Sequence, residues 1–189
     1  MGFVASLSDL SHQGMKETWY NSSIMLEGLC NFFKSSASAV LDDCGYENQS
    51  EHLSAGRFLN YLDISIRCKP MEQLLSAKMW EKVSDKLYLG VWLDEEKNKQ
   101  LAFYAWLELA ESFQQDFFHR NQKANKLKSA LSKDWDFEFD GEHWIIKRVK
   151  PVEEIDFSKP TWKRDLKRFY EECLTQISET IFKTGEWLD

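Results

Sequence analysis

The residues nearest to a catalytic pattern are one acid on a predicted strand and a Glu-x-Lys triplet further along the chain. Asp63 alternates with apolar residues, and Glu95, Glu96 and Lys97 follow a strongly apolar run. In metal-dependent nucleases, carboxylates hold a divalent cation while a lysine assists the attacking water. Glu95 falls in a predicted turn rather than on a strand, so we interpret the triplet as a solvated turn. A nuclease-related or nucleic-acid-handling domain is kept as the alternative.

Other catalytic patterns do not occur in the sequence. Its histidines, His12, His52, His119 and His143, never take the HxxxH or HExxH spacing of a zinc site. The cysteines include no CxxC pair, and neither a GxSxG elbow nor a glycine-rich phosphate loop is found. We therefore expect no metal and no cofactor, and the patterns lean against an enzyme. We expect the cysteines to be reduced thiols in a cytoplasmic protein.

The charge of the chain bears on its partners. A net charge of −7 disfavours nucleic acid and anionic membranes, because affinity for phosphate comes largely from Lys and Arg. One basic stretch runs against this trend. On a helix, Arg120, Lys123 and Lys126 would share a face that could contact phosphates, although a solvated face near the negative end of a helix dipole explains them as well. No apolar run approaches the ~20 residues needed to span a bilayer.

A row of alternating acids and aromatics is the most unusual stretch of the chain. In a strand, Trp135, Phe137 and Phe139 point to one side. The other side carries a row of four carboxylates, namely Asp134, Asp136, Glu138 and Asp140. Two interpretations stay open. The row is either a rigid negative edge that binds a basic groove of a protein partner, or a solvated edge strand charged to discourage edge-to-edge pairing.

The pairing of this strand follows from the turn that we predict. A two-residue type I′ loop at Asp140 and Gly141 would set Phe137 opposite Trp144. The apolar sides of the two strands then meet, which is the unit of sheet stabilisation. The same pairing sets Lys147 opposite Asp134 on the carboxylate side. The sequence therefore predicts a β-hairpin with one buried face.

The remaining periodicities place this hairpin in a mixed fold. Period 3.6 predicts helices over residues 15–40, 71–83, 113–131 and 162–181, and period two predicts a strand over 62–68. Residues 86–93 are apolar on both faces and are interpreted as a central strand, and residues 101–109 are interpreted as a second strand that could also open a helix. Residues 46–56 are polar and are interpreted as a loop. We predict a flexible N-terminus over residues 1–14 and one α+β domain over 15–189. Its sheet, antiparallel or mixed, would have about 4–5 strands with helices packed on it, including long amphipathic N- and C-terminal helices.

These patterns favour a non-enzymatic protein-binding factor. We expect an inhibitor, an antitoxin or immunity-type protein, or a viral counter-defence protein that occludes a basic surface of its partner with the acidic hairpin face. The chain is also rich in aromatics, with 8 Trp and 13 Phe. Some of these large rings are expected on a binding surface. Burial of surplus aromatics in a homo-oligomer is a third interpretation.

Overall fold

A six-stranded antiparallel sheet forms the centre of the fold, with strand order β1-β2-β3-β4-β6-β5. The computed structural model describes residues 27–28, 30–32, 35, 37–55, 61–74, 80, 86–94, 101–109, 129–131, 133–139, 143–151, 154–155 and 159–183. The strands are β1 (Tyr46–Ala55), β2 (Tyr61–Pro70), β3 (Lys86–Asp94), β4 (Leu101–Glu108), β5 (Trp135–Phe139) and β6 (Trp144–Pro151). Three helices accompany them in the described ranges: α2 (Ser38–Cys44), α6 (Trp162–Ile177) and the π-helix η5 (Ser178–Lys183).

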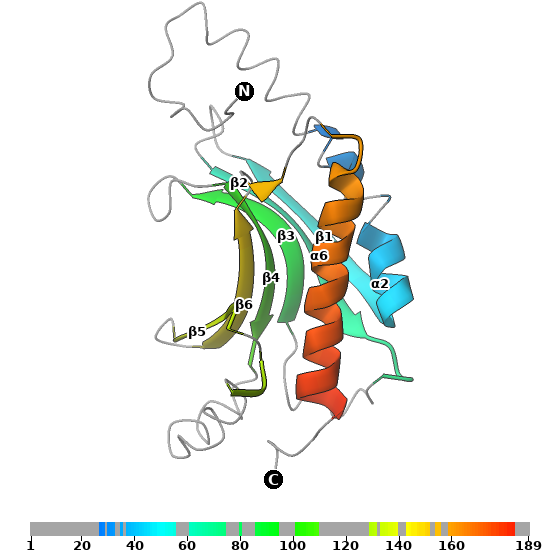
Figure 1. The fold of residues 1–189 in the computed structure, drawn as a ribbon, viewed down its shortest axis with the longest axis vertical. Coiled ribbons are helices and arrows are strands. Elements are labelled where there is room, and N and C mark those ends of the chain that lie inside the picture. The colour runs from blue at the N-terminus through cyan, green and yellow to red at the C-terminus, as the bar shows by residue number, and fades with distance from the viewer. Residues whose placement is uncertain are drawn as a thin grey trace, which may run out of the picture.

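The described helices cover one face of the sheet, which we call the helix face (Figure 1). The hydrophobic core lies between this face and α6. Its sheet side includes Ile64, Ile66, Leu87, Leu89, Val91, Phe103, Leu107 and Ile146, and its helix side includes Leu166, Phe169, Tyr170, Cys173, Leu174 and Ile177. Full burial of one such aliphatic or aromatic side chain contributes about 1.5–3 kcal/mol. The Tyr170 hydroxyl also donates a hydrogen bond of 2.7 Å to the Gly90 carbonyl, which fixes α6 on β3.

The predicted fold class is wrong in its balance of strands and helices. The sheet has six strands instead of four or five, and the only long helix among the described residues is α6, near the C-terminus. Where a long N-terminal helix was predicted over residues 15–40, the structure describes short helical stretches at residues 27–28 and 30–32 and the seven-residue α2, whose C-cap is Gly45 with a left-handed φ of 78°. The described part of the chain is mostly sheet rather than a sheet framed by two long helices.

The missed strand is β1, which was interpreted as a loop. Two features hide it from a period-two pattern. A bulge between Asn48 and Ser50 shifts its pairing with β2, so the alternation is interrupted halfway. The strand also lies at the edge of the sheet, where Asn48, Gln49 and Ser50 are exposed, whereas Tyr46 is fully buried under α6.

Several other predictions are confirmed. The strands predicted over residues 62–68, 86–93 and 101–109 are β2, β3 and β4, and every strand pairing is antiparallel. The buried stripe predicted for the last helix is also present in α6. The flexible N-terminus predicted over residues 1–14 and most of the helix predicted over 113–131 lie outside the described residues. None of the described helices is long and apolar enough to cross a membrane.

Candidate functional site

The acidic strand forms a hairpin as predicted, but its register differs by two residues. Phe137 lies opposite Ile146, and Phe139 lies opposite Trp144. The predicted pairing of Phe137 with Trp144 through a two-residue loop is therefore wrong, and residues 140–143 connect the strands. Because side chains alternate with a period of two, a shift of two residues leaves every side chain on its predicted face. One face of the hairpin is buried, and Trp135 is only 3% exposed.

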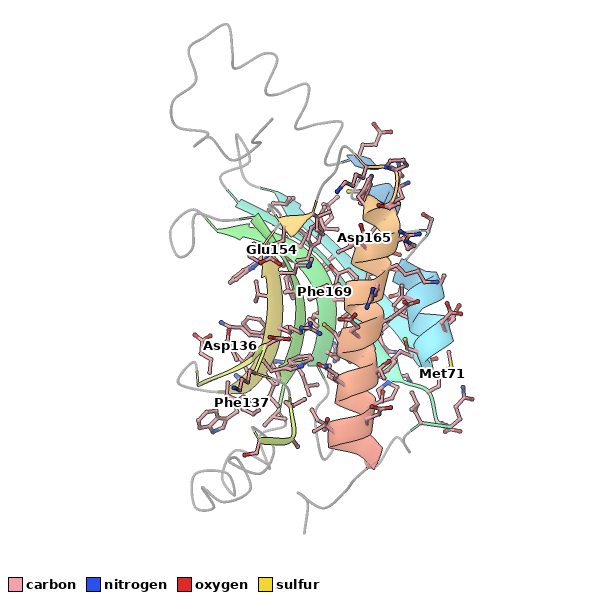
Figure 2. All side chains as sticks on the ribbon, in the orientation of Figure 1. Met71, Asp136, Phe137, Glu154, Asp165 and Phe169 are labelled. Carbon is pink, nitrogen blue, oxygen red and sulfur yellow. The ribbon has the colours of Figure 1, made fainter. Side chains whose placement is uncertain are left out.

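The structure separates the four predicted carboxylates. Asp136 and Glu138 lie on the side of the sheet away from α6, which we call the second face, and Figure 2 shows Asp136 at the margin formed by β5. Glu138 forms an ion pair with Lys147. Asp134 precedes β5, and its carboxylate lies 3.5 Å from the Arg148 guanidinium. Asp140 lies outside the described residues. Asp136 is exposed and makes no ion pair with a described residue.

An aromatic cluster occupies the centre of the second face. It consists of Trp92, Tyr104 and Trp106, whose ring centroids lie 6.1–6.5 Å apart and whose planes are inclined by 71–72°. Such edge-to-face pairs contribute about 0.5–1.5 kcal/mol beyond the area they bury. The small residues beside the rings make the cluster possible, because Tyr104 lies opposite Gly90 and Trp92 lies opposite Ala102.

Tyr104 reaches across β3 to a carboxylate on β2. Its hydroxyl donates a hydrogen bond of 3.0 Å to Asp63. The path runs over Gly90, where an added Cβ would lie 2.7 Å from the Tyr104 ring. The other oxygen of Asp63 lies 3.9 Å from Nε2 of His52 on β1. Side chains from three strands, His52, Asp63 and Tyr104, thus meet in one row on the second face.

The acidic margin and the aromatic cluster form one continuous surface. The strand registers set Trp106 on β4 beside Lys147 on β6, and Lys147 beside Asp136 on β5. The Lys147 ammonium lies 5.8 Å from the centroid of the Trp106 ring, within the range of a cation–π contact. The candidate site is therefore this surface, with the partly exposed Trp92 and Trp106 rings at its centre, the buried Tyr104 ring packed against them, and carboxylates along the β5 margin.

Contacts on the helix face hold the hairpin in place. The Arg148 guanidinium lies 3.5 Å from Asp134, 3.6 Å from Glu172 on α6, and 5.5 Å from the Phe169 ring. The Trp135 indole N–H donates a hydrogen bond of 2.6 Å to Gln176 on the same helix. The acidic margin is thus presented by a strand that is tied to the core helix.

The alternative catalytic and nucleic-acid residues are not tested by the structure. Glu95, Glu96 and Lys97 lie outside the described residues, as does the predicted basic face of Arg120, Lys123 and Lys126. Asp63, the acid proposed for a metal site, is instead a hydrogen-bond acceptor for Tyr104. Within the described ranges, no three His, Cys, Asp or Glu side chains are grouped to hold a metal ion.

Burial makes three of the cysteines poor nucleophiles. Desolvation raises the pKa of the Cys44 thiol to about 11 and that of Cys173 to about 12, and it also raises the pKa of Cys68. A reactive cysteine needs the opposite shift, toward the thiolate. Cys44, Cys68 and Cys173 form no disulfide in the part of the chain that the structure describes.

Sequence reasoning missed the aromatic cluster as a site. The signal was present in the alternation of Tyr88, Gly90 and Trp92 on one strand and of Ala102, Tyr104 and Trp106 on the next. Alternation alone places each set on one face, but only the register between the strands sets Tyr104 over Gly90.

Comparison with protein-family models, with curated proteins and with solved structures finds no match for this chain.

Proposed function

We propose that the chain is a non-enzymatic protein-binding factor that covers a basic surface of its partner with the second face of the sheet. The classes that fit this role are an inhibitor, an antitoxin or immunity-type protein, and a viral counter-defence protein. The observation that carries the proposal is the position of Asp136 and Glu138 on the same face as the Trp92–Tyr104–Trp106 cluster. Aromatic side chains are enriched among the residues that dominate binding energy at protein interfaces, and charges around them set association rate and specificity.

The composition supports the same conclusion. The net charge of −7 attracts a basic partner at long range and repels polyanions. Among the described residues of this margin, the two carboxylates of β5 face one cation, Lys147, so the margin keeps a negative charge. The hairpin is held by α6 through Arg148 and Trp135, so little ordering of its backbone is needed on binding.

Charge reversal at the β5 margin tests the proposal. The double variant Asp136→Lys/Glu138→Lys is expected to fold and to lose capture of a basic protein from host lysate. The loss should be largest at low salt, because exposed charges are screened beyond roughly 10 Å at 0.1 M ionic strength. Captured proteins are identified by mass spectrometry, and folding is checked by urea unfolding.

A matched variant controls for net charge. Asp42→Lys/Glu179→Lys changes the net charge by the same amount, but its two exposed residues lie on α2 and η5. This variant is expected to capture the same protein as the parent chain. Equal capture by all three proteins would show that the β5 carboxylates have no part in binding.

A further inference from the structure

A cation already occupies the boundary between the aromatic cluster and the acidic margin. The Lys147 ammonium contacts the Trp106 ring at 5.8 Å and pairs with Glu138. Its side chain is 19% exposed, whereas that of Glu138 is 51% exposed. The ring and the carboxylate together therefore form a cation-binding position that the chain fills from its own strand β6.

Lys147 has a second carboxylate within its reach. In the β5–β6 pairing it lies directly opposite Asp136, whereas Glu138 lies diagonally from it. Side chains directly opposite on antiparallel strands have their Cβ atoms about 4.5–5.5 Å apart. Lys147 can therefore turn from Glu138 to Asp136 and keep an ion pair. That rotation releases both the Trp106 ring face and the Glu138 carboxylate.

We infer that the released position receives an arginine side chain of the protein partner, with its guanidinium stacked on Trp106 and paired with Glu138. This inference rests on the proposed function and names the chemistry of the partner at that surface. A guanidinium fits the position better than an ammonium, because it is planar, stacks on indole rings and forms two parallel hydrogen bonds with a carboxylate. Lys147 is then an internal competitor of the partner's arginine.

Substitution of Lys147 distinguishes this inference from simple charge attraction. Lys147→Met removes the competitor, keeps much of the aliphatic side chain, and should tighten arginine binding. Lys147→Arg fills the position with a guanidinium from within and should weaken it. Lys150→Met removes one positive charge from the same strand, but Lys150 lies on the helix face opposite Phe103 and pairs with Glu154. It is therefore the matched control for charge.

The test titrates the ¹⁵N-labelled full chain with hexa-arginine and hexa-lysine peptides and follows the backbone amides and indole N–H signals. Hexa-arginine is expected to shift the Trp106 indole and the amides of Glu138 and Lys147, and to bind about fivefold more tightly than hexa-lysine. Lys147→Met should lower the dissociation constant for hexa-arginine by about threefold to tenfold relative to Lys150→Met. Lys147→Arg should remove the preference for arginine.

Several results would overturn the inference. Equal affinity for the two peptides, or equal effects of Lys147→Met and Lys150→Met, would reduce the contact to non-specific attraction. A ten-nucleotide single-stranded DNA that shifted the same indole signal would identify a base-stacking surface instead. If the arginine preference is missing while Asp136→Lys/Glu138→Lys still abolishes protein capture, the proposed function stands and the arginine assignment falls.

Discussion

Gly90 is the position where one methyl group should do the most damage to the second face. A Cβ there would lie 2.6 Å from the Ile64 carbonyl oxygen and 2.7 Å from both Cζ and the hydroxyl of Tyr104. Neither contact can be relieved by rotating the new methyl group. Gly90→Ala must therefore push β3 from β2, displace the Tyr104 ring from its hydrogen bond with Asp63, or do both.

The size of the effect follows from these contacts. Overpacking costs about 1–3 kcal/mol. Loss of a hydrogen bond to a charged acceptor costs about 1.5–3 kcal/mol, and the lower end applies because Asp63 is partly exposed. Replacing glycine in a strand recovers about 0.5–1 kcal/mol. We expect Gly90→Ala to lower the free energy of unfolding by about 2–4 kcal/mol, which corresponds to roughly 10 °C in melting temperature for a chain of this size.

Urea unfolding of three variants measures this prediction. Gly28→Ala is the matched control, because a Cβ at Gly28 meets nothing within 4 Å. It should leave stability unchanged or raise it slightly. Tyr104→Phe removes only the hydrogen bond and should cost about 1–2 kcal/mol. If Gly90→Ala costs less than about 0.5 kcal/mol, the close packing of Tyr104 over Gly90 is refuted, since overpacking normally costs more.

Two further predictions concern stability. Arg148→Met should lower the free energy of unfolding by about 1–3 kcal/mol, because Arg148 is 15% exposed and joins Asp134 to Glu172. The control is Arg168→Met, which removes the exposed pair of Arg168 with Glu172 and should cost less than about 0.5 kcal/mol. Equal costs would show that Arg148 does not tie the hairpin to α6. Burial raises the pKa of Cys68 and Cys173 above the usual 9.0, so these thiols ionise first in the unfolded chain. The stability that comes from keeping these two thiols protonated is fully present below pH 9. Above pH 9, each thiol should lower the unfolding free energy by about 1.4 kcal/mol per pH unit. Urea unfolding between pH 8 and 10.5 checks this, and an unchanged slope in Cys68→Ala would contradict it.

The parts of the fold that the sequence predicts are those with uninterrupted periodicity. In β2, Ile64 and Ile66 alternate with Asp63, Ser65 and Arg67, and one side of the strand is buried in the core. In α6 the stripe through Leu166, Phe169 and Cys173 keeps its period over the whole helix. The strand β1 was missed because its bulge breaks the alternation at Asn48 and because an edge strand has few buried residues.

The site was less predictable, because it depends on how strands align. The acidic residues were visible as a row, but the ion pair of Glu138 with Lys147 depends on a register that the turn sequence did not specify. Asp134 was expected in the row and instead contacts Arg148. The aromatic cluster joins β3 to β4 through pairs such as Tyr104 with Gly90, and no local pattern encodes that alignment.

The contacts of β5 and β6 with α6 link binding at the hairpin to the mobility of the core helix. Arg148 and the Trp135 indole link the margin of the sheet to Glu172 and Gln176, two residues of the core helix. A partner that binds the hairpin would therefore restrict the motion of α6, on the opposite face of the sheet, without contacting it. Backbone amides of α6 should exchange with solvent more slowly in the complex, so hydrogen exchange in this helix would reveal whether a partner is bound at the hairpin.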